Sequence, residues 1–496
     1  MTLVDWLILA AYMGVVLSIG LLAGRGSKSA DDLYRGGRRV PAWAIGISVL
    51  ATSLSGVTFI GGPQQAYLSD LTYLSASIAT VIAAVLVSWL FLPKFFAANV
   101  STVYEVIGDR RGVVARRACA SMFFLGRLLA SGVRVYVAAI AMSMIFFDDL
   151  QEWQLVVCTL AFAVAALIYT SWGGIKAVIW TDTLQAIVLV IAVGGSILVL
   201  TGQIDMPFSA ATDSLGDAGK LKLIDLTPSM TSTFSLWSVL IGWVLFNAAS
   251  LGTDQDMAQR LFSSRSAGRA AGALIGSQVA AIAVVSLFMT VGLMLFLRDS
   301  NSAEGLADGT RRVFLSFILS DLPVGLRGLL IAGLFAAAMS SMDSTMASMS
   351  SALVLDLGLG GKTEADSAKV ARIGNLVVGV GLSTFAIIFA IVAAGEEEGI
   401  IPFALGVMTY AYAGLLAVFV CVLLLDRGSG ATIIAALVTG AVTVHLMREF
   451  SGTSIGWWMV VAFSASLLVC ALQKGKRPIP ESQQRGFEVV LAEEIK

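Results

Sequence analysis

The stretch GISVLATSLSGVTFIGGPQQAY, at residues 46–67, is long and apolar enough to cross a lipid bilayer. Its centre is unlike that of an ordinary membrane helix, because small polar residues crowd it and Gly61, Gly62 and Pro63 follow. Every backbone N–H and C=O group in hydrocarbon needs a partner, so an interrupted helix is tolerated only beside a cavity or a ligand. Carbonyl groups freed at such an interruption can bind cations. The alternative interpretation is a continuous helix whose small residues pack tightly against neighbours.

The composition of the whole chain indicates a polytopic membrane protein. Its 496 residues are 57% hydrophobic and 13% charged, whereas a soluble chain carries about 25% charged residues. The net charge of −1 gives no reason to expect a nucleic-acid partner. The four cysteines lie singly in apolar segments, so neither a disulfide framework nor a zinc site is predicted.

Thirteen apolar runs are long enough to span a bilayer. If the N-terminus lies outside, the cytoplasmic segments hold 23 Lys and Arg residues and the external segments hold 7, as expected because Lys and Arg favour cytoplasmic loops. The sequence therefore predicts an all-α membrane protein with the N-terminus outside and the C-terminus inside. The runs lie at residues 3–23, 42–68, 74–97, 118–147, 154–171, 178–200, 235–252, 270–297, 325–355, 370–394, 400–424, 430–447 and 454–472.

The chain is predicted to form a single transmembrane domain. Spans two and seven run in opposite directions, as do four and nine, which an inverted repeat of five spans each requires. A small surface helix is expected in the long external segment 201–234. The predicted parts are an extra helix (3–23), a first repeat (42–200), a second repeat (235–424), two C-terminal helices (430–472) and a cytoplasmic tail (473–496).

Span nine carries a row of hydroxyl groups. Ser341, Ser344, Thr345 and Ser348 recur at intervals of three and four residues, which places them on one helix face. Hydroxyl and carbonyl oxygens are hard donors that suit an alkali or alkaline-earth cation. The row therefore favours a cation site, although a seam of small residues packed against a neighbouring helix would give the same pattern.

Four charged residues are predicted at membrane depth, namely Arg127, Arg134, Asp182 and Asp343. Each costs about 3 kcal/mol near the bilayer centre, so they must pair, face water or bind ligands. One interpretation is two internal Arg–Asp pairs, and the other is a set of cation-binding carboxylates with an arginine that anchors an anionic solute. Asn247, in the seventh run, fits either a solute contact or a helix–helix hydrogen bond.

Motifs typical of enzymes and pumps are missing from the sequence. It contains no HExxH, Walker A or Rossmann glycine pattern. The sequence GTSIG at 452–456 fits GxSxG but falls between membrane helices, without the strand–turn–helix setting that a hydrolase needs. The chain is therefore predicted not to be an enzyme.

Five segments together resemble the sodium:solute symporter family, and they occur in that family's order along nearly the whole chain. The resemblance implies a leucine-transporter-type fold of two inverted five-helix repeats, with one extra helix before them and two after. The segments are ADDLYRGGRRVPAW (30–43), ATSLSGVTFIG (51–61), YTSWGGIKAVIWTDTLQ (169–185), GTDQDMAQR (252–260) and LFAAAMSSMDSTMASMSS (334–351).

The resemblance also implies positions for sodium. The main sodium ion would bind the backbone carbonyls of Ala51 and Leu54, together with oxygens of span nine from Ser341, Ser344 and Thr345. Asp182 matches an acidic residue near a second sodium position in the sialic acid branch. Asp343 stands where that branch has a serine, so it would either add a ligand or line the cytoplasmic path.

A solute would sit at the interruption, beside Ser53, Ser55, Thr58 and Tyr73. The other implied solute residues come from three different spans. Arg127 takes the position of a carboxylate-binding arginine, with Arg134 as an accessory residue on the same face. Asn247 aligns with a sugar-contacting asparagine, and Ser77 replaces a solute-binding glutamine.

The predicted function is sodium-coupled import of a small polar solute by alternating access, with a sugar, a sialic acid-like compound or another carboxylate as the solute. The alternatives are a proton-coupled transporter of the same fold and a transporter-like membrane sensor. The expected ligands are sodium and the solute, in the lipid bilayer of a bacterial inner membrane. No nucleic acid and no obligate protein partner are expected.

Overall fold

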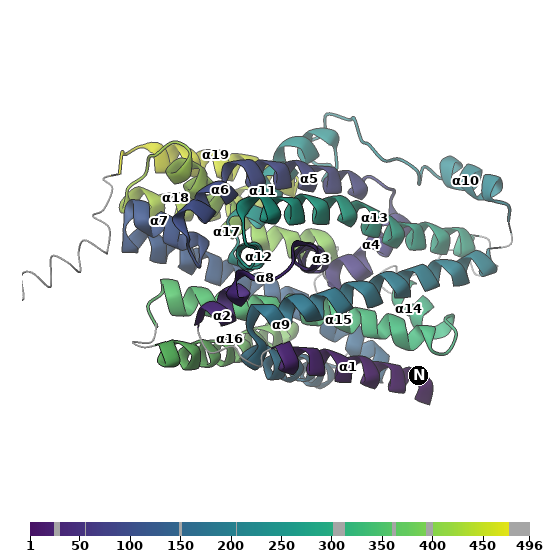
Figure 1. Cartoon of the computed structure of the whole chain (residues 1–496). Helices are drawn as coiled ribbons and strands as arrows, with labels where there is room; N and C mark the ends of the chain where they lie inside the picture. The colour runs from purple at the N-terminus through teal and green to yellow at the C-terminus, as the bar shows by residue number, and fades with distance from the viewer. Residues whose placement is uncertain are drawn as a thin grey trace, which may run out of the picture.

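A computed structural model describes residues 1–23, 30–54, 56–147, 151–204, 206–300, 313–359, 364–392 and 400–475 (Figure 1). Within these ranges the chain is helical and forms no strand. The helices of the first half are α1 (Leu3–Ala23), α2 (Ala30–Arg35), η1 (Gly36–Arg38), α3 (Ala42–Ser53), α4 (Gly56–Leu68), α5 (Tyr73–Leu90), α6 (Leu92–Ala98), α7 (Val103–Arg111), α8 (Val113–Phe147), α9 (Glu152–Gln203) and α10 (Phe208–Asp217). Those of the second half are η2 (Ser238–Trp243), α11 (Val244–Gly252), α12 (Gln255–Phe262), α13 (Ala267–Ser300), α14 (Val313–Ser320), α15 (Leu326–Ser351), η4 (Ala352–Asp356), α16 (Glu364–Val392), α17 (Ile400–Leu423), α18 (Gly430–Phe450) and α19 (Ile455–Ala471).

The predicted spans coincide with helices. Among the described residues, nine single helices and the bent pair α3–α4 are long and apolar enough to cross a membrane, which makes up to ten spans. The other three predicted runs coincide with the first part of α9 and with the shorter apolar helices Ser238–Gly252 and Ile455–Ala471. The all-helical class is therefore confirmed, whereas the count of thirteen and the orientation stay predictions.

The short loop expected between the fifth and sixth runs is a kink inside α9. Gly174 has φ 57° and ψ −163° there, a conformation that L-residues with a side chain rarely adopt. A Cβ atom on Gly174 would lie 2.6 Å from the carbonyl oxygen of Leu33 in α2. Glycine is needed at this position both for its backbone angles and for the close approach of α2.

Helix α15 lies at the centre of the molecule. It is buried on all sides from Leu330 to its end at Ser351, although many of these residues are Ser and Thr. It packs against α9, α1, α8 and α16. A helix that is buried all round has no lipid-facing side, so its polar residues can meet only other protein groups, bound ions or water.

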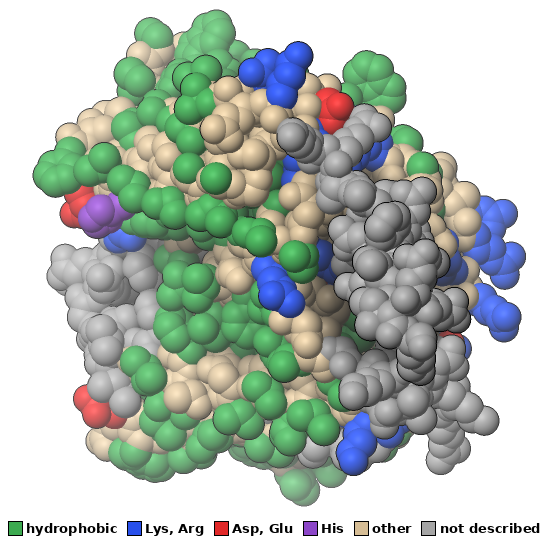
Figure 2. Space-filling view, turned by 90° about the vertical axis from the view of Figure 1, so that its left-hand side faces the viewer, with side chains coloured by type: hydrophobic (Ala, Val, Ile, Leu, Met, Phe, Trp, Pro, Cys, Tyr) green, Lys and Arg blue, Asp and Glu red, His purple; other side chains and the backbone are tan. Residues whose placement is uncertain are grey.

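The two ends of the helix bundle differ. The N-terminus and α10 lie at one end, and α2 and α7 lie toward the other (Figure 1). The surface helix expected in segment 201–234 is confirmed as α10. In the coil that follows it, Lys222 donates a hydrogen bond to Asp225, and this bond lowers the pKa of Asp225 well below its usual value. Figure 2 shows Lys and Arg side chains recurring across the opposite end, which the predicted orientation places in the cytoplasm.

Candidate functional site

The helix predicted to be interrupted is bent by 57° between α3 and α4. Leu54 leaves the helical conformation, with φ −92° and ψ 79°, while its N–H still bonds to the carbonyl of Leu50. The interruption is therefore confirmed, and Ser55 at its centre lies outside the described residues. The last carbonyl groups of a helix have no intrahelical donors. Such carbonyls lie at the bend, where Ala51 and Leu54 were predicted to bind sodium.

A small cavity lies between this bend, α9 and α15. Gln185 of α9 is 2% exposed, and neither atom of its side-chain amide has a hydrogen-bond partner of normal geometry, with the hydroxyl of Tyr12 in α1 as a polar neighbour. An unpaired buried amide destabilises the folded state unless an ion, water or another ligand satisfies its polar atoms. Neutral oxygen atoms are ligands that suit an alkali cation, and Gln185 and Ser340 carry the side-chain oxygens among the lining residues, although the surface of the cavity itself is apolar. The cavity is lined by Ala51, Leu54, Gln185, Ala186, Leu189, Ala336, Ala337 and Ser340.

The three hydroxyl groups of α15 that were predicted to bind sodium are not among the residues that line this cavity. Ser341 donates to the carbonyl of Ala337 in its own helix. Thr345 lies 3.0 Å from the hydroxyl of Ser131 in α8, and Ser344 donates to Asp256 in α12 at 3.4 Å. All three are buried, and the turn of α15 that lines the cavity ends at Ser340, directly before Ser341.

Asp182 lies next to this turn and is fully buried. Ser340 donates to its Oδ1 at 2.6 Å, and Ser48 of α3 donates to its Oδ2 at 2.5 Å. Arg260 of α12 contacts the same Oδ2 at 3.2 Å. Asp182 therefore connects α3, α9, α12 and α15, so the predicted second sodium position is brought together with the bend. Asp343, also fully buried, accepts a hydrogen bond from the backbone N–H of Ser344.

A network of buried ion pairs continues from Arg260 across α12. Arg260 pairs with Asp256 through Nη1 at 2.5 Å. Asp256 in turn pairs with Arg127 of α8 at 2.6 Å, and Asp254 pairs with the same guanidinium at 3.0 Å. The hydroxyl of Tyr412 in α17 donates to Asp254 at 2.6 Å. Buried charges are tolerated when they are paired and hydrogen-bonded in this way.

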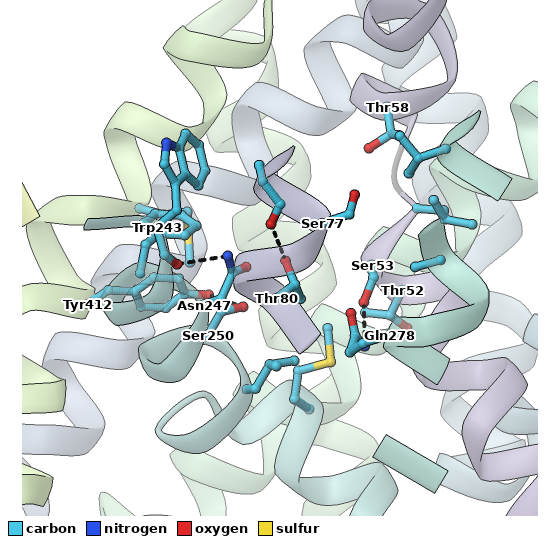
Figure 3. Close-up of a pocket in the computed structure, with 18 of the residues that line it drawn as sticks. Thr52, Ser53, Thr58, Ser77, Thr80, Trp243, Asn247, Ser250, Gln278 and Tyr412 are labelled. Atoms are coloured by element: carbon cyan, nitrogen blue, oxygen red, sulfur yellow. Dashed lines mark hydrogen bonds between the residues drawn. The ribbon is translucent and has the colours of Figure 1, made fainter. Parts of the chain in front are cut away.

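A larger cavity lies on the other side of the bend (Figure 3). Hydroxyl and amide groups from α3, α5, α11 and α13 surround it, with Trp243 and Tyr412 among its aromatic residues. The described residues predicted to contact solute all line it, namely Ser53, Thr58, Tyr73, Ser77, Arg127 and Asn247. Sequence reasoning missed Thr80, Ser250, Gln278 and Tyr412, because no spacing rule connects one residue from each of several helices.

The two arginines of α8 differ in this cavity. Arg127 is 2% exposed and forms ion pairs with Asp254 and Asp256, so that only its Nη1 has no partner. Arg134 also lines the cavity, and among the described residues it has no ion pair or hydrogen bond. Arg134 was predicted as an accessory residue. The structure gives it more free donors than Arg127, because the partners of Arg127 come from α12, which the sequence pattern placed in a loop.

Comparison with known proteins identifies the class. The model of the sodium:solute symporter family matches residues 33–440. The chain is 30% identical to the sodium/sialic acid symporter of Aliivibrio fischeri, over 76% of this chain and 74% of that protein. It is 26% identical to the sodium/sialic acid symporter of Proteus mirabilis, over 92% of each chain. A solved structure of a Na⁺-coupled sialic acid symporter in an outward-open state superposes with a TM-score of 0.86 at 24% identity, over 96% of this chain and 100% of that one.

These matches define a secondary transporter of the plasma membrane that crosses the bilayer several times. The chain belongs to the sodium:solute symporter family. It is therefore a transporter and not an enzyme, and sodium is its coupling ion. The sequence-based predictions of family, class and coupling ion are confirmed.

Proposed function

We propose that this protein uses sodium to import a small anionic solute, which binds in the larger cavity against Arg134. The observation that carries this proposal is the free guanidinium of Arg134, together with the unpartnered Nη1 of Arg127, among hydroxyl and amide groups in one cavity. A buried guanidinium favours a carboxylate or another oxyanion, to which it can bind bidentately. The relatives named above transport sialic acid, which carries a carboxylate, and this supports the same class of solute here.

Sodium would bind between the bend and α15, held by the carbonyls of Ala51 and Leu54 and by Ser340 and Gln185. This set keeps the two carbonyls predicted from the sequence and adds two residues that line the small cavity. The hydroxyls of Ser341, Ser344 and Thr345 would serve on the path to the cytoplasm, one turn further along. Asp182 would position Ser340 through the hydrogen bond between them.

The two cavities share Leu54, which gives a physical basis for coupling. Sodium bound at the bend would fix the conformation of Leu54, and Ser53 and Thr58 on either side of it would then be placed for the solute. Residues 42–200 and 235–424 would act as inverted repeats that rock against each other and expose the cavities alternately. Each sodium ion that moves through 100 mV supplies about 2.3 kcal/mol to this cycle.

The proposal is tested with purified protein in detergent, by thermal unfolding in sodium or potassium buffer with panels of carboxylates, sialic acids, amino acids and neutral sugars. We expect anionic solutes to raise the unfolding temperature in sodium only, because a ligand that binds the folded state stabilises it. Arg134→Gln should remove this shift and leave the stabilisation by sodium alone. A shift produced by neutral sugars that survives Arg134→Gln would contradict the anionic solute.

The control is Arg269→Gln, which changes an exposed arginine at the start of α13, away from the residues that line either cavity. Its anion-dependent shift should equal that of the unmodified protein. Uptake of the best solute into proteoliposomes then checks coupling, since an inward sodium gradient should drive accumulation and an equal potassium gradient should not.

A further inference from the structure

Arg260 occupies the position beside Asp182 where a second sodium ion would be expected. Its Nη2 lies 3.2 Å from Oδ2 of Asp182, and its Nε donates to the hydroxyl of Ser48 at 2.9 Å. Ser48 donates to the same Oδ2, and Ser340 donates to Oδ1. Both carboxylate oxygens of Asp182 are therefore already engaged, and the guanidinium of Arg260, which Asp256 also contacts, lies against Oδ2.

The guanidinium cannot leave this place easily. Arg260 and Asp182 are both fully buried, and arginine is not deprotonated in proteins. Asp256 holds Arg260 from the other side, with its carboxylate and its backbone carbonyl both accepting from Nη1. A second cation that approached Oδ2 of Asp182 would find that oxygen occupied and would be repelled by the guanidinium, which lies 3.2 Å from it.

The small cavity at the bend differs from the position beside Asp182, because none of the described cationic side chains fills it. None of the described residues that line it is cationic, and the amide of Gln185 there has no partner. The space at the bend is thus free of cationic side chains among its described lining residues, while the position beside Asp182 is filled by one. The two lie next to each other, because Ser340 lines the cavity and also donates to Asp182.

We propose that Arg260 is a tethered cation that takes the place of a second sodium ion at Asp182, so that one sodium ion binds per protein molecule. This inference rests on the sodium coupling described above and deepens it, because it sets the stoichiometry. Asp182 acts in this view as a positioning residue for Ser340 and Arg260, and not as a sodium ligand.

The first test uses the unmodified protein. Isothermal titration with sodium chloride at constant ionic strength, with choline as the balancing cation, should give one bound sodium ion and a Hill coefficient of about one. Two bound ions would overturn the tethered-cation proposal and leave sodium coupling intact. No bound sodium at all would instead count against the sodium site itself, so the two failures can be told apart.

The second test uses variants in a sodium titration followed by thermal unfolding. Arg260→Gln should open the position at Asp182 and raise the Hill coefficient for sodium above one, and the added Asp182→Asn substitution should lower it again. Arg260→Lys is the matched control, because it keeps the tethered charge and should keep the Hill coefficient at about one. Asp182→Asn alone should also leave that coefficient at about one, and a coefficient that stays at one in Arg260→Gln would overturn the proposal.

Discussion

At the scale of single residues, the buried charges do not pair as one of the two sequence-based interpretations proposed. The simplest interpretation joined Arg127 and Arg134 to Asp182 and Asp343 within the spans. The structure instead pairs Arg127 with two aspartates of α12 and pairs Asp182 with Arg260 of the same helix. Arg134 is left facing the larger cavity. Each pairing depends on α12 being folded into the protein, where every one of its residues is buried.

The unpartnered amide of Gln185 gives a prediction at this scale. Gln185→Met should leave the sodium-free protein as stable as before or more stable, because it removes a buried polar group that has no partner. The variant should bind sodium about tenfold more weakly, which corresponds to about 1.4 kcal/mol for one lost oxygen ligand. Sodium titrations followed by thermal unfolding measure both effects.

Gln259→Met is the matched control for this variant. Gln259 of α12 is equally buried, at 1% exposed, and both atoms of its amide also lack partners, yet it does not line the small cavity. Its removal should leave the sodium affinity unchanged. Equal sodium affinities in Gln185→Met and the unmodified protein would show that Gln185 is not a ligand.

At the scale of elements, the bend depends on how closely α4 can approach α13. The backbone of Gly292 in α13 faces the carbonyl group of Pro63, and a Cβ atom placed on Gly292 would overlap that oxygen. The rings of Phe59 in α4 and Phe288 in α13 pack edge to face at 5.5 Å in the same interface. The half of the interrupted helix beyond the bend is therefore held by a close contact with α13.

We expect Gly292→Ala to destabilise the folded protein by about 1–3 kcal/mol, the usual cost of overpacking a close helix contact. Gly276→Ala in the same helix should have little effect or stabilise slightly, because nothing lies within 4 Å of a Cβ atom there. Thermal unfolding of the two variants in one detergent compares them. Equal unfolding temperatures would mean that α4 can move away from α13 without cost.

At the scale of the whole molecule, the predicted orientation connects the charge distribution of the sequence to the two ends of the bundle. The segment that contains Lys222 follows α10, at the end of the bundle where the N-terminus lies (Figure 1). Arg265 lies between α12 and α13, on the side predicted to be cytoplasmic. With the N-terminus outside, Lys222 should face the periplasm and Arg265 should face the cytoplasm.

Labelling of single cysteines tests this orientation in intact bacteria. Lys222→Cys should react with a membrane-impermeant maleimide in whole cells, and Arg265→Cys should react only after the cells are permeabilised. The four native cysteines are all buried and should give little background, which the unmodified protein measures. The reverse labelling pattern would invert the predicted topology.

The sequence by itself determined the class of this protein, the interrupted second span, the family and the coupling ion. These features depend on composition, on the length of apolar runs and on motifs within single segments, so they can be recognised without knowing which helices touch. The described residues that were expected to contact solute all line one cavity, and their contact with a solute stays a prediction.

Only the tertiary structure decided which turn of α15 meets the bend and which charges neutralise each other. Periodicity places Ser341, Ser344 and Thr345 on one helix face, but the hydroxyl of α15 that lines the small cavity in the packed structure belongs to Ser340. The partners of Arg127 and Asp182 lie more than 75 residues away in the chain. Periodicity in a sequence reports which residues share a face, whereas contact between faces depends on how all the helices pack together.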